Sequence, residues 1–354
     1  MCQVDNPEFI EVGLASAAAI GLGTSVLAAQ DDGSKTGIPT RPLGKTGVRV
    51  SIICLGGWHI GRAGKESGED DAIQIMHRAL DDGVTFWDNA WDYHDGYAEE
   101  LMGKALKGRR DRVILMTKNC ERDYEGSKKN LDDSLRRLGT DRIDLWQFHE
   151  MVYDNDPDWV FEKGGFKAAM EAVKAGKVRF VGFTGHKDPL IHLKMLARLE
   201  EFRKHATDLK DYEWASAQMP INLMDAHYRS FQKQVVPECL KRGVGVIGMK
   251  GLAGGHPKGR IPEKGLATAV ECRRFALSLP IASLVCGMIS MKDLEQDVGV
   301  ARNFKPLNES DQSALLARVR DQATDGRHEL FKSSKAYDGP HHRKQHGFDV
   351  EVSA

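Results

Sequence analysis

The chain has 354 residues, of which 41% are hydrophobic and 29% are charged, and its formal net charge is −1 at pH 7. This length suits one large domain or two ordinary ones, and the hydrophobic share supports a substantial core. A nearly neutral chain has no general attraction to nucleic acid or to anionic membranes, so neither is expected as a partner.

The first thirty residues differ in composition from the rest. Residues 12–23 are small and apolar, like the core of an export signal, but too short and Gly-rich for stable membrane insertion. The segment Phe9–Ala15 is similar to the one that follows the arginine pair of twin-arginine signals, yet Pro7 and Glu8 stand where that pair would be. The localisation is therefore left open: cytoplasmic, or exported if residues 1–30 act as a signal-like segment.

Two further segments flank a predicted barrel domain at 41–324. Residues 31–40 are polar and are predicted to form a linker, and Arg41–Ser51, with two turn glycines, is predicted to form a β-hairpin before the barrel. Residues 325–354 form a polar tail with several histidines. A loosely packed tail is favoured over a metal-binding one.

Strand and helix signals alternate along the predicted domain. The expected strands are Ile52–Leu55, Val84–Trp87, Val113–Thr117, Ile143–Phe148, Val178–Phe183, Ala215–Met219, Val244–Gly248 and Ser283–Cys286. The expected helices, with apolar residues at three- and four-residue steps, are Glu69–Asp82, Tyr97–Leu106, Gly126–Leu138, Gly164–Ala175, Pro189–Phe202, Phe231–Arg242, Gly265–Ser278 and Met291–Ala301. Eight such units predict an α/β fold, a (β/α)8 TIM barrel. A doubly wound sheet is disfavoured because no G-x-G-x-x-G follows the first strand.

Three of these strands end in residues that suit proton transfer. Asp88 follows Trp87 directly, and Tyr93 comes five residues later. Lys118 directly follows the predicted strand Val113–Thr117, and His149 directly follows Ile143–Phe148. In a TIM barrel, polar residues at the carboxyl ends of the strands point into the active-site mouth. The sequence therefore predicts that these four side chains meet there.

This ordered series closely resembles the aldo-keto reductases. So do Arg41–Ser51, Leu55–Trp58 and Gly103, which lies ten residues after Tyr93. The resemblance implies an oxidoreductase that reduces an aldehyde or ketone, including sugars and small carbonyl compounds, to an alcohol. No side chain delivers hydride, so NADP(H), or alternatively NAD(H), is the implied cofactor. The oligomeric state is left open.

The resemblance also implies a role for each of the four residues. Tyr93 would donate a proton to the developing alkoxide, and the Lys118 ammonium is expected to lower its pKa from the free value of ~10. Asp88 would hold Lys118 charged and oriented. His149 would hydrogen-bond the substrate oxygen and set the approach of the carbonyl.

The cofactor positions implied by the resemblance match less well. Thr184 and Gly185 lie where the family commonly has a Ser-Asn pair on the nicotinamide carboxamide, with His186 as a substitute for the lost amide and Gln218 as a second carboxamide ligand. Met249 would pack on the nicotinamide, where many members stack a tyrosine. The remaining cofactor residues are expected along the pyrophosphate and the adenosine: Lys250, Leu252, Gly287, Met288, Ser290, Lys292, Asp293 and Asp297.

One of these positions bears on cofactor choice. Many relatives place an arginine against the 2′-phosphate of NADP(H), and the corresponding residue here is Asp293. A carboxylate repels phosphate, whereas the adjacent Lys292 offers a point charge without the fork of an arginine. NADPH is therefore expected to be preferred over NADH by only about tenfold or less, or about 1.4 kcal/mol.

The substrate pocket is expected to be partly aromatic and partly polar. Its candidate residues are Trp58, His59, Trp91 and Glu150. In aldo-keto reductases the carboxyl-terminal segment often folds over the barrel mouth, so Phe331 and Tyr337 are also expected to line the pocket. Such a pocket suits aldehydes, ketones or sugars.

Two other kinds of protein remain as alternatives. A regulatory or binding protein on the same barrel, like the potassium-channel β-subunits, would be weakly catalytic or inactive, and the intact set of four residues argues against it. A barrel hydrolase or isomerase would need paired carboxylates or a metal site. The six cysteines are widely spaced without a C-x-x-C pair, so no metal site is expected and buried thiols are favoured.

Overall fold

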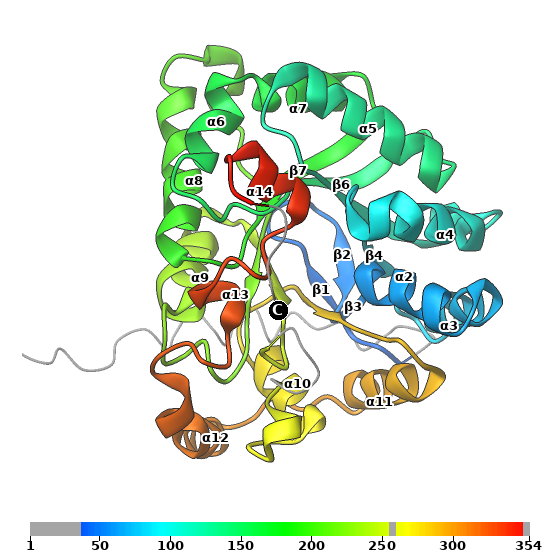
Figure 1. Ribbon diagram of the computed structural model, residues 1–354, viewed down its shortest axis with the longest axis vertical. Coiled ribbons are helices and arrows are strands. Elements are labelled where there is room, and N and C mark those ends of the chain that lie inside the picture. The colour runs from blue at the N-terminus through cyan, green and yellow to red at the C-terminus, as the bar shows by residue number, and fades with distance from the viewer. Residues whose placement is uncertain (1–36, 255–259, 350–354) are drawn as a thin grey trace, which may run out of the picture.

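The computed structural model describes residues 37–254 and 260–349, in which eight parallel strands close into a barrel (Figure 1). The strands are β3 (Ile53–Gly56), β4 (Phe86–Asp88), β5 (Ile114–Asn119), β6 (Ile143–Phe148), β7 (Val178–Thr184), β8 (Ser216–Pro220), β9 (Gly245–Met249) and β10 (Ser283–Cys286). Each strand pairs with the next in the chain, and β10 pairs with β3. The predicted (β/α)8 barrel is confirmed.

Helices surround the barrel and add to those expected. They are α2 (Gly57–Glu66), α3 (Glu69–Asp81), α4 (Tyr97–Leu106), α5 (Tyr124–Leu138), α6 (Asp156–Glu162), α7 (Gly165–Lys174), α8 (Pro189–Arg203), α9 (Phe231–Arg242), α10 (Ala269–Ser278), α11 (Met291–Arg302), α12 (Glu309–Ala323), α13 (Leu330–Ser333) and α14 (Pro340–Gln345). The sequence did not predict α2, α6, α12, α13 or α14. Three glycines in α2 lower its helix propensity, which hides it from sequence reasoning. The helix predicted from Gly265 begins at Ala269, because Thr268 and Glu271 form a capping box there.

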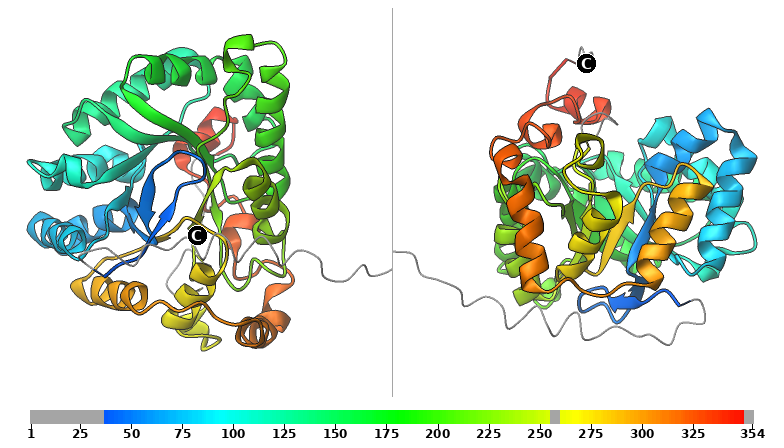
Figure 2. Two further views of the ribbon diagram at one scale, coloured as in Figure 1. Left: turned by 180° about the vertical axis from the view of Figure 1, so that it is seen from behind. Right: turned by 90° about the horizontal axis from the view of Figure 1, so that it is seen from below.

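The predicted hairpin is confirmed and closes the amino end of the barrel. Its strands β1 (Thr40–Pro42) and β2 (Arg49–Ser51) are antiparallel. Leu43 and Val50 from the hairpin pack in one buried cluster with inward-facing strand residues such as Phe86. The right-hand view of Figure 2 shows the hairpin and the carboxyl-terminal segment at opposite ends of the barrel. The hairpin thus lies at the amino ends of the strands, and the tail lies at their carboxyl ends.

The tail packs firmly against the barrel, so the expectation of loose packing is wrong. Lys332 is buried and donates to Asp225 Oδ1 at 2.7 Å and to Glu329 Oε2 at 3.0 Å. Farther along, Arg122 Nη2 lies 3.3 Å from His342 Nδ1. A buried charge is costly unless it is paired, so these contacts explain how a polar segment can be held in place. Composition alone could not reveal the partners.

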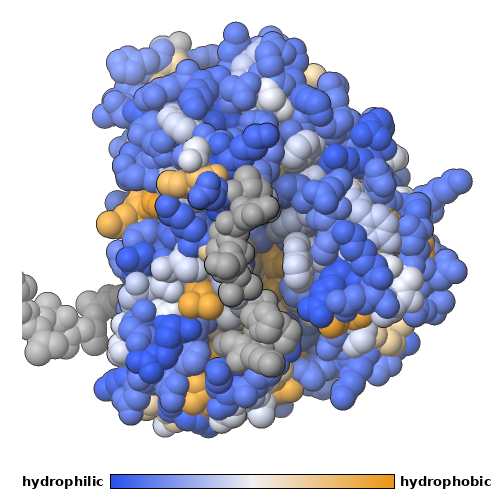
Figure 3. Space-filling model, in the orientation of Figure 1, coloured by the Kyte–Doolittle hydropathy of each residue, from blue (hydrophilic) through white to orange (hydrophobic). Residues whose placement is uncertain are grey.

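The face seen in Figure 3 is largely hydrophilic, with scattered apolar spots. In the ranges 37–254 and 260–349, none of the helices has both the length and the apolar character that crossing a membrane requires. The signal-like segment at 1–30, most of the linker at 31–40 and the last five residues of the tail lie outside the described residues. The domain limits 41–324 remain a prediction.

Acidification is expected to destabilise the fold through His192 on α8. This side chain is fully buried, its Nε2 donates to Gln218 O at 3.1 Å, and burial lowers its pKa to about 4. An unfolded histidine titrates near ~6.5, so below that pH only the unfolded chain takes up the proton. Stability is therefore lost as the pH falls from about 6.5 to about 4, by about 2 kcal/mol between about pH 7 and about pH 5.

Urea unfolding at those two pH values measures this loss, and His192→Leu is the matched variant. The leucine cannot titrate, so the variant should lose about 2 kcal/mol less than the parent chain over the same interval. Equal losses in the two chains would show that His192 does not govern the acid sensitivity.

Candidate active site

Asp88 and Lys118 form a buried ion pair at the carboxyl ends of adjacent strands β4 and β5. Lys118 Nζ donates to Asp88 Oδ1 and, at 2.6 Å, to the carbonyl of Asn89. The Lys118 side chain is 1% exposed and the Asp88 side chain is 3% exposed. Burial raises the pKa of Asp88, and the Lys118 ammonium opposes that rise. Each charge is thus the partner that the other needs in a dry environment.

Tyr93 reaches this pair from a short 3₁₀ turn, η1 (Tyr93–Gly96). Its hydroxyl lies 3.3 Å from Lys118 Nζ. The turn places His94 at φ 54° and Asp95 at φ 59°, in the left-handed region that residues other than glycine rarely adopt. Such strained backbone occurs preferentially at functional sites.

His149 lies beside Tyr93 and directly follows β6. Its backbone N–H donates to Asn119 O at 2.8 Å. Its ring is edge-to-face with that of Tyr93, with the ring centroids 5.5 Å apart. Four residues from separate parts of the sequence therefore gather at one end of the barrel.

The acidity of Tyr93 differs from the sequence-based expectation. Burial raises its pKa well above the usual value, and the carboxylates of Asp88 and Asp92 raise it further. The expectation that Lys118 lowers this pKa was wrong because it counted one cation and not the surrounding carboxylates and the desolvation. The consequence is a phenol that stays protonated at neutral pH.

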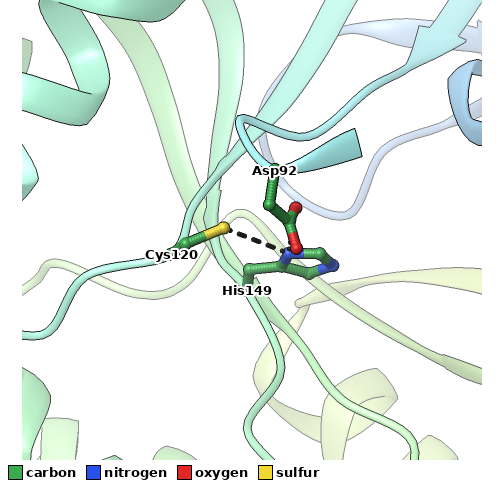
Figure 4. A group of neighbouring side chains, drawn as sticks. All are labelled: Asp92, Cys120 and His149. Carbon is green, nitrogen blue, oxygen red and sulfur yellow. Dashed lines mark hydrogen bonds and ion pairs between the residues drawn. The ribbon is translucent and has the colours of Figure 1, made fainter. Parts of the chain in front are cut away.

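Asp92 and Cys120 flank His149, as Figure 4 shows. Asp92 Oδ1 lies 3.2 Å from His149 Nδ1, and Cys120 Sγ lies 3.4 Å from the same nitrogen. The sequence analysis missed both residues. Asp92 directly precedes Tyr93, and Cys120 comes two residues after Lys118, so proximity to the candidate tetrad in the chain was the available signal.

Gln218 offers a buried acceptor where a carboxamide is expected. Its Nε2 lies 3.7 Å from Met249 Sδ, and its Oε1 is buried with no hydrogen-bond partner. Thr184 ends the neighbouring strand β7 and pairs with Gln218 in the sheet. An unpaired buried acceptor is costly, and the amide N–H of a nicotinamide carboxamide is the kind of donor that would satisfy it. These residues therefore fit the implied cofactor.

Gly185 and His186 differ in how far that role is open to them. The Gly185 N–H already donates to Gln218 O at 3.2 Å, and a Cβ at Gly185 would lie 2.2 Å from Met151 O. Glycine is needed there for close approach of the backbone. His186 Nδ1 donates to Phe331 O at 3.0 Å, whereas its buried Nε2 has no hydrogen-bond partner and lies 3.7 Å from Glu150 Oε1. The Gly185 N–H is thus engaged by the protein itself, and a cofactor contact of His186 stays a prediction.

The residues after β10 surround the amino end of α11. A Cβ at Gly287 would lie 2.5 Å from the ring of His59, so the backbone approaches that ring closely. Ser290 is the N-cap residue of α11, and Asp293 Oδ2 accepts from its hydroxyl at 2.8 Å and from the Ile289 N–H at 3.2 Å. A carboxylate therefore already occupies this helix end, which is otherwise a natural anion site.

Three other predicted cofactor residues differ in their burial and in their contacts. Met288 is fully buried in the main hydrophobic core, so its proposed cofactor contact is not supported. Asp297 accepts from Arg273 Nε at 3.0 Å and is buried, so it is a structural ion-pair partner and not a free adenine contact. Lys292 is exposed and remains available. Sequence spacing could not reveal a partner 24 residues away.

Lys250 and Leu252 follow β9. Lys250 has φ 53°, burial lowers its pKa, and its ammonium lies 5.2 Å from the centroid of the Phe331 ring. Leu252 is half-buried and packs on the smaller core cluster beside α10 and α12. Phe331 itself is fully buried. Tyr337 is half-buried.

The four predicted substrate residues lie in different surroundings. Trp58 is 41% exposed, and burial lowers the pKa of His59 to about 3. Trp91 Nε1 donates to Asp133 Oδ2 at 3.2 Å, which turns this ring toward α5. Glu150 accepts from the tail amide of Gly339 at 2.9 Å. Trp91 and Glu150 are therefore already engaged by other parts of the chain.

Comparisons with known proteins agree with this architecture. The model of the Aldo/keto reductase family matches residues 52–268. The chain belongs to the aldo-keto reductase family. The uncharacterized oxidoreductase YrpG of Bacillus subtilis is 31% identical over 65% of this chain and 72% of its own. An L-galactose dehydrogenase of Arabidopsis thaliana is 27% identical over 79% of this chain and 93% of its own.

A solved structure shares the fold. It is the holo form of an aldo-keto reductase from Bacillus halodurans, with a TM-score of 0.63 and 24% identity, and the match covers 79% of this chain and 96% of that one. Family membership supports oxidoreductase activity on carbonyl compounds, and the family generally uses NAD(P)H.

Proposed function

We propose that this aldo-keto reductase reduces an aldehyde or ketone with NADPH, using Tyr93 as the proton donor. The observation that carries the proposal is the position of Lys118 Nζ, which donates to Asp88 and lies 3.3 Å from the Tyr93 hydroxyl. Carbonyl reduction needs a proton donor that stays neutral until charge develops beside it. Because its pKa is raised, the Tyr93 phenol stays neutral until that charge develops.

A nicotinamide held at Gln218 and Thr184 would supply the hydride that the carbonyl carbon needs. Tyr93 O–H breaks as its proton passes to the carbonyl oxygen, and the product leaves as an alcohol. The Lys118 ammonium stabilises the phenolate that remains, and Asp88 keeps the ammonium in place. His149 orients the substrate oxygen. A proton from water restores the phenol.

The carboxylates beside the mouth support a class of substrate. Asp92 and Glu150 bring carboxylates to it. Like charges repel, so anionic substrates are disfavoured and uncharged aldehydes, ketones or sugars are favoured. The named activity of the Arabidopsis relative makes sugars a reasonable part of the panel.

A substrate panel tests the function directly. Purified protein is incubated with NADPH or NADH and uncharged aldehydes, ketones and sugars, and the absorbance of the reduced nicotinamide is followed. Loss of that absorbance only when a carbonyl compound is present is the expected result. A chain that binds cofactor but turns over neither these carbonyls nor the corresponding alcohols would contradict the proposal.

NADPH is expected to be preferred over NADH by about tenfold or less in kcat/KM. Asp293→Arg should widen the preference, since it replaces a repelling carboxylate with a bidentate phosphate ligand. Because Asp293 also accepts from Ser290 and Ile289 at the start of α11, this change removes two hydrogen bonds and leaves Ser290 as the N-cap.

The matched control is Asp293→Asn, which keeps an acceptor oxygen at the cap and removes the charge. It should widen the preference less than the arginine does. A clear preference of the parent chain for NADH would mean that Asp293 receives a ribose hydroxyl and that the expected use of NADP(H) is wrong.

A further inference from the structure

We propose that Asp92, Cys120 and His149 form a binding site for one divalent transition-metal ion of the zinc class. Their side chains come from three places: the loop after β4, the end of β5 and the end of β6. Carboxylate oxygen, thiolate sulfur and imidazole nitrogen are the three kinds of ligand that zinc takes in proteins. The proposal departs from the sequence-based expectation of no metal, which relied on cysteine spacing alone.

The spacing of the three donor atoms fits tetrahedral coordination. Bond lengths of about 2.0 Å to oxygen and nitrogen and about 2.3 Å to sulfur require an oxygen–nitrogen edge of about 3.3 Å and a sulfur–nitrogen edge of about 3.5 Å. The observed edges are 3.2 Å from Asp92 Oδ1 to His149 Nδ1 and 3.4 Å from Cys120 Sγ to the same nitrogen. All three donor atoms lie within 4.8 Å of one another (Figure 4). A metal ion therefore needs only small side-chain movements.

Asp92 gives a second, independent observation. Its Oδ1 is buried, and the groups that it faces are His149 Nδ1, 3.2 Å away, and Cys120. A second carboxylate converges on the same region: a Cβ at Gly339 would lie 2.7 Å from Glu150 Oε2 and 3.2 Å from Asp92 Oδ2. Two buried carboxylates that converge on one place favour a cation between or beside them.

A comparison within the protein shows why this cluster, and not the one in the tail, is proposed. Asp156 lies with His342 and His346, but its carboxylate is already saturated. It accepts from Arg122 Nε at 3.2 Å and from the backbone N–H groups of Val152 and Tyr153. The Arg122 guanidinium thus occupies the Asp156 carboxylate itself, whereas at His149 it donates to the backbone carbonyl, at 2.6 Å.

The role assigned to the metal rests on the proposed function, whereas metal binding itself does not. Coordination through Nδ1 leaves the single ring proton of neutral His149 on Nε2, which points away from Asp92 and Cys120 in Figure 4. That tautomer is the one that donates a hydrogen bond to a carbonyl oxygen. The metal would then hold His149 in its donating form and orientation. It would not be the reacting centre.

Cobalt(II) is the probe that tests the site. Titration of the full chain under anaerobic conditions should produce thiolate-to-cobalt charge-transfer absorption and tetrahedral d–d bands that saturate at one equivalent, and Zn²⁺ should displace them. Cys120→Ser should abolish the charge-transfer band and weaken binding roughly 100-fold. Loss of a residue that only hydrogen-bonds a metal ligand already lowers metal affinity by about tenfold to 100-fold. Asp92→Asn should weaken binding and leave the thiolate band in place.

Two control variants should keep the full spectrum. Cys2→Ser removes a thiol that lies outside the described residues, and His346→Gln removes a histidine of the tail cluster. Circular dichroism checks that each variant is folded. Absent bands in the parent chain, or bands unchanged in folded Cys120→Ser, would overturn the site.

The role is tested by KM for the carbonyl substrate with and without one equivalent of Zn²⁺. A lower KM in the loaded enzyme, lost in Cys120→Ser, is expected, with the KM of the cofactor unchanged. An equal or higher KM would overturn the role. Because the spectra do not require turnover, a chain that binds cobalt but reduces no carbonyl would contradict the proposed function and leave the metal site standing.

Discussion

Tyr93→Phe is expected to lower kcat for carbonyl reduction by about 10²-fold to 10⁴-fold. The substitution removes one oxygen, and with it the proton that the developing alkoxide needs. Tyr93 lies 3.3 Å from Lys118 Nζ and edge-to-face with His149, so no ring contact need be lost. Cofactor binding should be unchanged, because the cofactor residues supported by the structure, such as Gln218, are kept in this variant.

Steady-state kinetics and cofactor fluorescence titration together measure this result. Tyr97→Phe is a matched control: it removes a phenol four residues further on, on α4, where the Lys65 ammonium lies 5.9 Å from its ring centroid. Only Tyr93→Phe should lose turnover. Turnover at the parent rate in that variant would remove Tyr93 from the mechanism.

Lys118→Met is expected to abolish most of the activity as well and to destabilise the fold. The variant leaves the Asp88 carboxylate buried without its partner, a change that typically costs about 3–5 kcal/mol. The phenolate of Tyr93 would also lose its counter-charge and remain among the carboxylates that already raise the pKa of this phenol. A decrease in kcat of about 10²-fold or more follows.

The double variant Asp88→Asn/Lys118→Met separates stability from chemistry. It replaces the buried ion pair by two neutral side chains of similar size, so the unfolding free energy should recover much of the loss. The activity should stay low, because the ammonium is still missing. Recovery of turnover in the double variant, or a mild effect of Lys118→Met alone, would count against the assigned role of Lys118.

The structure also explains where sequence reasoning about the fold fell short. Tail residues Lys332 and His342 are polar, and their composition indicated loose packing. Their partners, Asp225 and Asp156, lie 107 and 186 residues earlier. Pairing over such separations leaves no local signal, since each residue alone has the appearance of a solvated surface side chain. The short helices α13 and α14 were missed for the same reason.

The sequence by itself determined the barrel, the hairpin and the nearness of Asp88, Tyr93, Lys118 and His149. Each depends on local signals: apolar runs separated by amphipathic helices, and polar residues at strand ends that the barrel topology must bring to one mouth. Only the tertiary structure decided the immediate surroundings of that mouth. It paired Asp297 with Arg273 and brought Cys120 and Asp92 to His149. The pKa of Tyr93 was decided there too, because desolvation and charge act through space and not along the chain.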